Sequence, residues 1–271
     1  MQQTLPMRRS EPARRGRRWL QLELRWAGLP VTILGLLALW QLVVVAGGYR
    51  PFILPGPALV AERFLQAAGS GILWQHTSAT LVEALGGFGI ALALGLSVGY
   101  LLAKLPWLER ALAPVLAASQ AIPVVAVAPL VILWFGPGLR SKLLIAALIT
   151  FLPILISTVV AIRSIPRELR EMALISGAGR WQMLRFVEAP LSLPVLFGGV
   201  RTGLALATTG AVVGEFVAGR EGLGAMINIA RGLFDTPLIF VALLTLATIT
   251  LGLYLAANLL ERLLVTWEPI S

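Results

Sequence analysis

The side chains that run enzyme chemistry are scarce in this chain. Its 271 residues include no cysteine and a single histidine, His76. Thiolate catalysis and cysteine-ligated metal sites are therefore excluded, and Ser–His triads nearly so. No Gly-x-x-x-x-Gly-Lys-Ser/Thr loop occurs, so the chain lacks the backbone cradle that holds nucleotide phosphates. We predict no catalytic residue, no metal site and no cofactor bound by this chain.

Three charged residues, Glu83, Arg201 and Glu215, lie within strongly apolar stretches. A charge at membrane depth is costly, and it usually faces a protein interior or water. For Arg201 and Glu215, pairing within the bundle and a role in a pathway both remain open, and Arg201 needs a partner on another span. Glu83 also suits a place at the membrane interface. The predicted pathway or gate residues are Gln120, Pro123, Arg201, Thr208 and Glu215.

A polar stretch, residues 163–186, has the spacing of a short helix. Ser164 or Ile165 can cap it, with Pro166 in the first turn, and Glu168 suits the positive end of the helix dipole. Its semi-apolar face is formed by Leu169, Met172, Ala173 and Ser176, and the run Gly177-Ala178-Gly179 ends it. Five arginines surround this helix. We predict an amphipathic helix on a membrane surface.

The elements that position these residues must lie in lipid. The chain is 58% hydrophobic and 13% charged, whereas soluble domains average about 45–50% and about 25%. A spanning helix needs about 20 mostly apolar residues. Six segments qualify, at residues 30–47, 80–103, 111–135, 143–162, 187–218 and 237–260. The sequence thus predicts an all-α polytopic membrane protein with about six transmembrane helices.

The net charge of +9 reports topology. With both termini inside, the inner segments hold 15 of the 22 Lys and Arg, as the positive-inside rule expects. No nucleic-acid partner is needed to explain this charge. The predicted parts are a basic cytoplasmic tail (1–29), a first transmembrane helix with an outer loop (30–79), a core (80–262) and a short cytoplasmic C-terminus (263–271).

Two local patterns refine these elements. Pro123 and Pro129 interrupt the third apolar segment close to Gln120, which predicts a deformable helix that lines a pathway, although an inert kink is the simpler alternative. In the outer loop, residues 58–68 repeat at helical spacing. They predict a short helix, either at the membrane interface or packed as a cover on the first two spans.

The polar stretch also carries a sequence motif. Glu171-Met172-Ala173 is followed by three residues and Gly177, and nine residues later by Val187-Glu188-Ala189-Pro190. This pattern resembles the cytoplasmic loop of binding-protein-dependent ABC importer permeases: Glu-Ala-Ala, three residues, Gly, nine residues, Ile, one residue, Leu-Pro. The substitutions at 172, 187 and 189 are conservatively apolar. The resemblance extends over about residues 75–262.

The resemblance implies a type I ABC importer permease fold, with a cytoplasmic coupling helix between the fourth and fifth spans. That helix docks on a separate ATPase, which binds ATP and Mg²⁺. A second copy of the chain, a substrate-binding protein and the bacterial inner membrane complete the expected partners. The coupling residues implied are Glu168, Glu171, Met172, Ala173, Gly177, Ala178 and Arg180. Without the motif, a helix lying on anionic lipid would be the simpler interpretation.

The substrate class stays open. Gly214-Glu215-Phe216 and Gly222-Leu223-Gly224 resemble permeases for nitrate, sulfonates or taurine. Residues 234–238, Phe-Asp-Thr-Pro-Leu, resemble relatives that import pyrimidine- or riboflavin-type vitamin precursors. We favour the second group and keep the anions as the alternative. An ATP-independent channel or secondary transporter is the alternative of another class, although the few intramembrane charges do not form a relay.

Overall fold

The computed structural model describes residues 15–266, and side chains from residue 30 onward. Residues 1–14 of the predicted basic tail, and residues 267–271 of the predicted C-terminus, lie outside this range. Within it, every regular element is a helix. Five helices are long and apolar enough to cross a membrane, or six if one bent pair forms a single span. The described chain therefore confirms the all-α polytopic fold.

The chain divides into two compact units, residues 1–59 and 60–271. The first contains α1 (Arg15–Gly47), whose residues 30–47 form the apolar part. The next helix, α2 (Pro57–Gly69), confirms the short helix predicted at 58–68. Within the second unit, the Arg63 guanidinium on α2 pairs with Asp235 at 2.6 Å. Asp235 in turn caps the last helix, because its side chain accepts from the backbone N of Leu238 at 3.1 Å.

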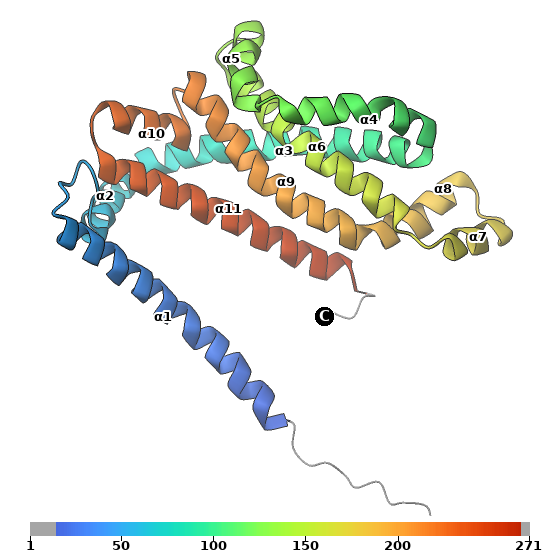
Figure 1. Cartoon of the computed structure of the whole chain (residues 1–271), viewed down its shortest axis with the longest axis horizontal. Helices are drawn as coiled ribbons and strands as arrows, with labels where there is room; N and C mark the ends of the chain where they lie inside the picture. The colour runs from blue at the N-terminus through green and yellow to red at the C-terminus, as the bar shows by residue number, and fades with distance from the viewer. Residues whose placement is uncertain (1–14, 267–271) are drawn as a thin grey trace, which may run out of the picture. The chain divides into compact units, whose positions relative to one another are not determined.

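Three long helices form the centre of the second unit: α3 (Ile72–Lys104), α6 (Leu139–Arg163) and α9 (Ala189–Ala218). They lie against one another in Figure 1. Small residues permit this approach. A Cβ added to Gly99 would lie 2.7 Å from the Thr158 side chain, and one added to Gly210 would lie 2.6 Å from the Ala146 Cα. The bundle is thus packed backbone against backbone.

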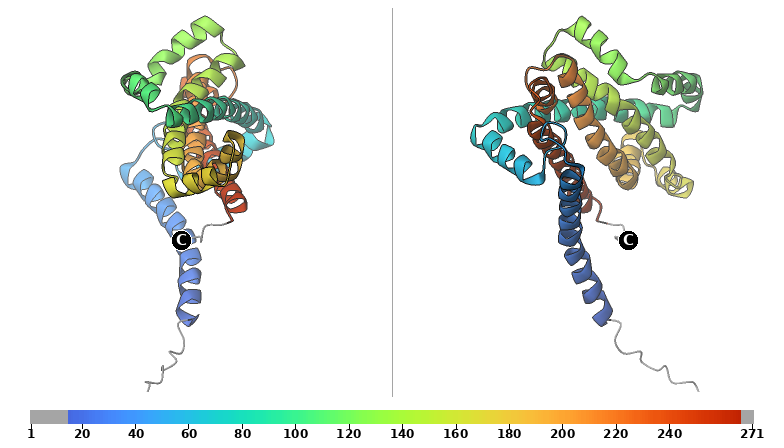
Figure 2. Two further views of the ribbon diagram at one scale, coloured as in Figure 1. Left: turned by 90° about the vertical axis from the view of Figure 1, so that its right-hand side faces the viewer. Right: turned by 60° about the vertical axis from the view of Figure 1, so that its left-hand side comes forward.

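The predicted third span, residues 111–135, is two helices. The first, α4 (Pro106–Ala121), and the second, α5 (Val124–Phe135), meet at 93°. The bend between these two green helices can be followed in Figure 2. Pro123 explains the break, because it has no N–H and disfavours a helical Ile122. Ile122 is extended, with ψ 115°. The proline is therefore a break between two helices, and the expected single deformable helix is corrected.

The remaining elements shift two predicted boundaries. The third helix begins at Ile72 rather than at 80, and α6 begins at Leu139 rather than at 143, which brings Lys142 into the helix. Residues 219–236, between the fifth and sixth predicted spans, contain α10 (Leu223–Gly232). The last helix, α11 (Thr236–Leu264), follows it. On the polar stretch lie α7 (Arg167–Ile175), α8 (Arg180–Gln182) and the π-helix η1 (Met183–Glu188).

Candidate functional site: the coupling segment and the charged clusters of the bundle

The predicted amphipathic helix is α7, and its C-terminal end is defined by one glycine. Gly177 has φ +81°, a left-handed conformation that glycine adopts at little cost. The backbone N of Ala178 donates to the Ala173 carbonyl at 3.0 Å, as in a Schellman motif. The N-terminal end differs slightly from the prediction, because Pro166 itself is the N-cap. At the C-terminal end, the carbonyls of Ala173 and Leu174 thus accept hydrogen bonds from the backbone N of Ala178 and Gly177 as the chain reverses.

One face of α7 is apolar and uncovered. Met172 is 65% exposed, and Ile175 is 87% exposed. The carboxylates of Glu168 and Glu171 are exposed on the same short helix, whereas Ala173 is half-buried. Large apolar side chains among charges at a surface mark an interaction site. The segment therefore has the composition of a docking surface, and the roles predicted for its residues remain predictions.

A buried carboxylate, Glu188, anchors this segment to the bundle. Tyr100 Oη on α3 donates to its Oε2 at 2.9 Å, and Lys104 Nζ donates to its Oε1. Arg170 Nε on α7 lies 3.5 Å from the same Oε1, and Arg170 Nη2 also donates to the Ile162 carbonyl at the end of α6. Glu188 thus joins α3, α7 and the start of α9 through one fully buried group.

In the sequence, Glu188 stands out only as part of the motif. A signal was nevertheless present, since Glu188 stands at the border of an apolar stretch, where an unpaired carboxylate is costly. Arg170, a cation of the polar stretch 163–186, lies 18 positions earlier in the sequence. The π-helix that ends at Glu188 could not be predicted from composition. Such helices are rare in proteins overall, and those that occur often lie at functional sites.

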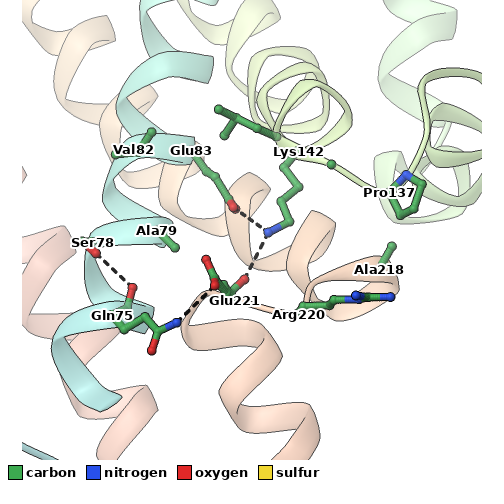
Figure 3. A pocket seen from close by; sticks show the side chains of 12 residues that line it. Gln75, Ser78, Ala79, Val82, Glu83, Pro137, Lys142, Ala218, Arg220 and Glu221 are labelled. Atoms are coloured by element: carbon green, nitrogen blue, oxygen red, sulfur yellow. Dashed lines mark hydrogen bonds and ion pairs between the residues drawn. The ribbon is translucent and has the colours of Figure 1, made fainter. Parts of the chain in front are cut away.

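At the other end of the bundle, Glu83 and Lys142 form a buried ion pair. The two charged atoms are 2.6 Å apart, and Lys142 Nζ also donates to the Glu221 carbonyl at 3.1 Å (Figure 3). They line a cavity of about 530 Å³ with Gln75 and Arg220. Glu83 is buried rather than interfacial. Lys142 was missed because the predicted helix began one residue after it.

Glu215 is fully buried and holds the start of α10. Thr80 Oγ1 donates to Glu215 Oε1 at 2.6 Å, and the Gly224 backbone N donates to Oε2 at 2.5 Å. The Leu223 backbone N donates to Thr80 Oγ1 at 2.8 Å. A Cβ on Gly222 would lie 2.1 Å from the Glu215 Cδ. Glu215 therefore secures the turn that leads from α9 into α10.

The other pathway candidates fall into two groups. Arg201 Nη1 pairs with Glu261 on α11 at 2.8 Å, which confirms a partner on another span. Thr208 Oγ1 lies 3.0 Å from Thr250 Oγ1, also on α11. Gln120 and Pro123 are exposed at the break between α4 and α5. Over the described residues, no group of three His, Cys, Asp or Glu side chains is placed to hold a metal ion.

Comparisons with known proteins agree with this architecture. Residues 91–267 match the family described as "Binding-protein-dependent transport system inner membrane component". The chain is 74% identical over 268 residues to the riboflavin transport system permease protein RibX of Chloroflexus aurantiacus, covering 99% of each chain. It is 31% identical over 242 residues to the taurine transport system permease protein TauC of Escherichia coli, covering 88% of each.

A solved structure shares the fold. The chain matches one chain of the inward-facing MetNI methionine ABC transporter with a TM-score of 0.60 and 20% identity, over 71% of this chain and 94% of that one. At such low identity the likeness concerns the fold alone. Together with the family match and the high identity to a transport permease, it places the sequence motif on the expected architecture. The chain belongs to the family of binding-protein-dependent transport system inner membrane components, and it is a permease of the ABC importer type.

Proposed function

We propose that two copies of this chain form the translocation pathway of an ATP-driven importer. Two ATPase subunits, which bind ATP and Mg²⁺, dock on the coupling segments, and a substrate-binding protein docks outside. One observation carries the coupling role: α7 leaves Met172 and Ile175 exposed while Arg170 ties it to the buried Glu188. A partner that moves α7 therefore pulls on α3 and α9 at once.

In this proposal, different residues of the coupling segment make different kinds of contact with the ATPase. Ala173, Gly177 and Ala178 are small and permit close approach of an ATPase surface. Met172 supplies apolar contact area. Charged contacts at the rim of the interface come from Glu168, Glu171 and Arg180. Because rim charges contribute little affinity, they set register and orientation more than strength.

We further propose that both termini are cytoplasmic and that the membrane is the bacterial inner membrane. This orientation places α7, Lys104 and Glu188 at the inner surface, and α10 with the Glu83–Lys142 pair at the outer surface. The five arginines of residues 163–186 support it through the positive-inside rule.

The pathway candidates act in two ways in this scheme. Gln120 and Pro123 are accessible where α4 meets α5, and they can contact the solute or the second copy directly. Arg201, Thr208 and Glu215 already have partners, so they act only when those contacts rearrange between inward- and outward-facing states.

For the solute, we propose a riboflavin-type vitamin or precursor. The 74% identity to a riboflavin transport permease supports this choice. Taurine-like anions, sulfonates or nitrate are the alternative, supported by the 31% identity to a taurine transport permease. Accumulation of labelled riboflavin and labelled taurine by cells with and without this gene separates the two classes.

The experiment that tests the importer role is affinity purification of the tagged chain from native membranes, combined with uptake into energised vesicles. We expect an ATP-binding chain to copurify in equal amount and uptake to require ATP. Uptake driven by an ion gradient, with no ATP-binding chain in the preparation, would establish the secondary-transporter alternative instead.

A further inference from the structure

A second cavity lies under the coupling segment. Its volume is about 560 Å³, and it lies between the cytoplasmic end of α3 and the inward face of α7. Its apolar wall includes Leu105, Leu174, Ala178 and Met183. Ligand pockets of this size combine mostly apolar walls with a few convergent polar groups. Most of the charged groups here are cations.

Three cations and one carboxylate line this cavity. The cations are Lys104, Arg170 and Arg180, and the carboxylate is Glu188. Full ionisation therefore leaves an excess of two positive charges. Glu188 is fully buried, accepts hydrogen bonds from Tyr100 and Lys104, and lies 3.5 Å from Arg170 Nε. This single carboxylate is shared by two cations, and Arg180 has no counter-charge of its own among the lining residues.

Donor groups remain available for a ligand. Arg170 uses Nη2 on a carbonyl and Nε toward Glu188, and its Nη1 has no partner among residues 30–266. The Arg180 guanidinium, which is exposed, likewise forms no ion pair within that range. Lys104 Nζ carries three protons and donates one to Glu188. Planar guanidinium groups beside an ammonium match the oxygens of a phosphate group.

We propose that this cavity, between Lys104, Arg170 and Arg180, binds the phosphate group of an organic phosphate. The cavity is much larger than an inorganic anion, and its apolar wall receives the organic part. Two sources supply this chemistry at the inner surface: the headgroup of an anionic phospholipid and a soluble phosphate monoester. A ligand here contacts α3 and α7 together, so it stiffens the link through which the ATPase acts.

The effect on coupling rests on the proposed function. The binding of the phosphate group does not, and it is tested separately. Purified full-length chain in phosphate-free dodecyl maltoside is heated with glycerol 3-phosphate in one arm and with phosphatidylglycerol in the other. Chloride at matched ionic strength serves as the reference. A ligand of the folded state raises the unfolding midpoint saturably. A shift with the first probe assigns a soluble ligand, and a shift with the second assigns a lipid.

Matched variants locate the site. We expect Arg180→Gln to weaken the apparent affinity about tenfold, which corresponds to about 1.4 kcal/mol. Arg185→Gln removes the same charge from the same segment but outside the cavity lining, and it should behave as wild type. Ala178→Leu narrows the cavity without changing charge and should also weaken binding, so the test survives poor folding of one variant.

The proposal is overturned if neither probe shifts the midpoint beyond chloride, or if Arg180→Gln and Ala178→Leu bind as tightly as wild type. Since no ATPase or binding protein is present, failure of this binding leaves the importer role intact. Conversely, loss of ATP-driven uptake leaves the binding result standing.

Discussion

Glu188 is the residue on which the coupling segment depends most directly. Its carboxylate is shared by Tyr100, Lys104 and Arg170, which come from two other helices. A neutral amide retains the shape and one acceptor oxygen, but it loses the charge that attracts both cations. Replacing Glu188 by glutamine therefore weakens the attachment of α7 to α3 without leaving a cavity at this position.

We expect Glu188→Gln to lower the amount of solute transported per ATP hydrolysed by about fivefold or more, the lower range of allosteric coupling. ATPase activity itself should be retained, because the importer that we propose binds ATP in a separate subunit. Transport and phosphate release measured in the same proteoliposomes give the ratio. Glu62→Gln, which removes an exposed carboxylate of α2, is the control. An unchanged ratio for Glu188→Gln would remove Glu188 from the coupling path.

The buried Glu83–Lys142 pair allows a second test at this scale. Breaking a buried ion pair from one side leaves an uncompensated charge, which costs about 3–5 kcal/mol, whereas removing both charges is often nearly neutral. We expect Lys142→Met to lower the unfolding midpoint strongly, and Glu83→Gln with Lys142→Met to restore most of it. Thermal unfolding in detergent of the wild type, Glu83→Gln, Lys142→Met and the double variant measures the interaction between the two residues. Additive effects would mean that the pair contributes no joint stability.

At the scale of elements, the coupling helix depends on where its chain reverses. Gly177 has φ +81°, and a side chain in a left-handed conformation costs about 1–2 kcal/mol, with Asn and Asp tolerated better than other residues. A Cβ added at Gly177 would have no other atom of this chain within 4 Å beyond its immediate neighbours. Any large effect of substitution must therefore come from backbone strain or from a docked partner.

Substitutions at Gly177 can distinguish backbone strain from contact with a docked partner. Gly177→Asn keeps the left-handed turn at little cost and should leave membrane insertion normal, and Gly177→Asp adds a charge of similar shape. If α7 inserts into an ATPase cleft, both variants should lose copurified ATPase while the isolated chain unfolds near the wild-type midpoint. Retention of stoichiometric, hydrolysis-stimulated ATPase in Gly177→Asp would contradict docking at this residue.

At the scale of the whole molecule, orientation is testable because the chain has no native cysteine. Ile175 on α7 is 87% exposed and Leu233 beside α10 is 71% exposed. We expect Leu233→Cys to react with a membrane-impermeant maleimide in intact spheroplasts. Ile175→Cys should react only after the membrane is opened, with the chain expressed without its ATPase. The reverse pattern would invert the proposed topology.

The sequence determined several features of this protein, each for a local physical reason. Apolar length identified the spans, because lipid requires about 20 apolar residues whatever the tertiary packing. The Gly177 turn and the amphipathic face of α7 followed from glycine conformation and helical period. The sequence contains no Gly-x-x-x-x-Gly-Lys-Ser/Thr loop, so it lacks that type of nucleotide-binding site. The motif around Glu171 and Gly177 then indicated the family.

Only the tertiary structure decided which charges meet. Glu188 with Arg170 and Lys104, Glu83 with Lys142, and Arg201 with Glu261 join residues from 18 to 84 positions apart. Their pairing depends on helix rotation and register, which hydropathy does not encode. The prolines marked an interruption of the third apolar segment, but the 93° bend at Pro123 and the contacts by which Glu215 holds α10 were decided by the tertiary structure. Composition says that a buried charge needs a partner, and the packed backbone alone determines which one it finds.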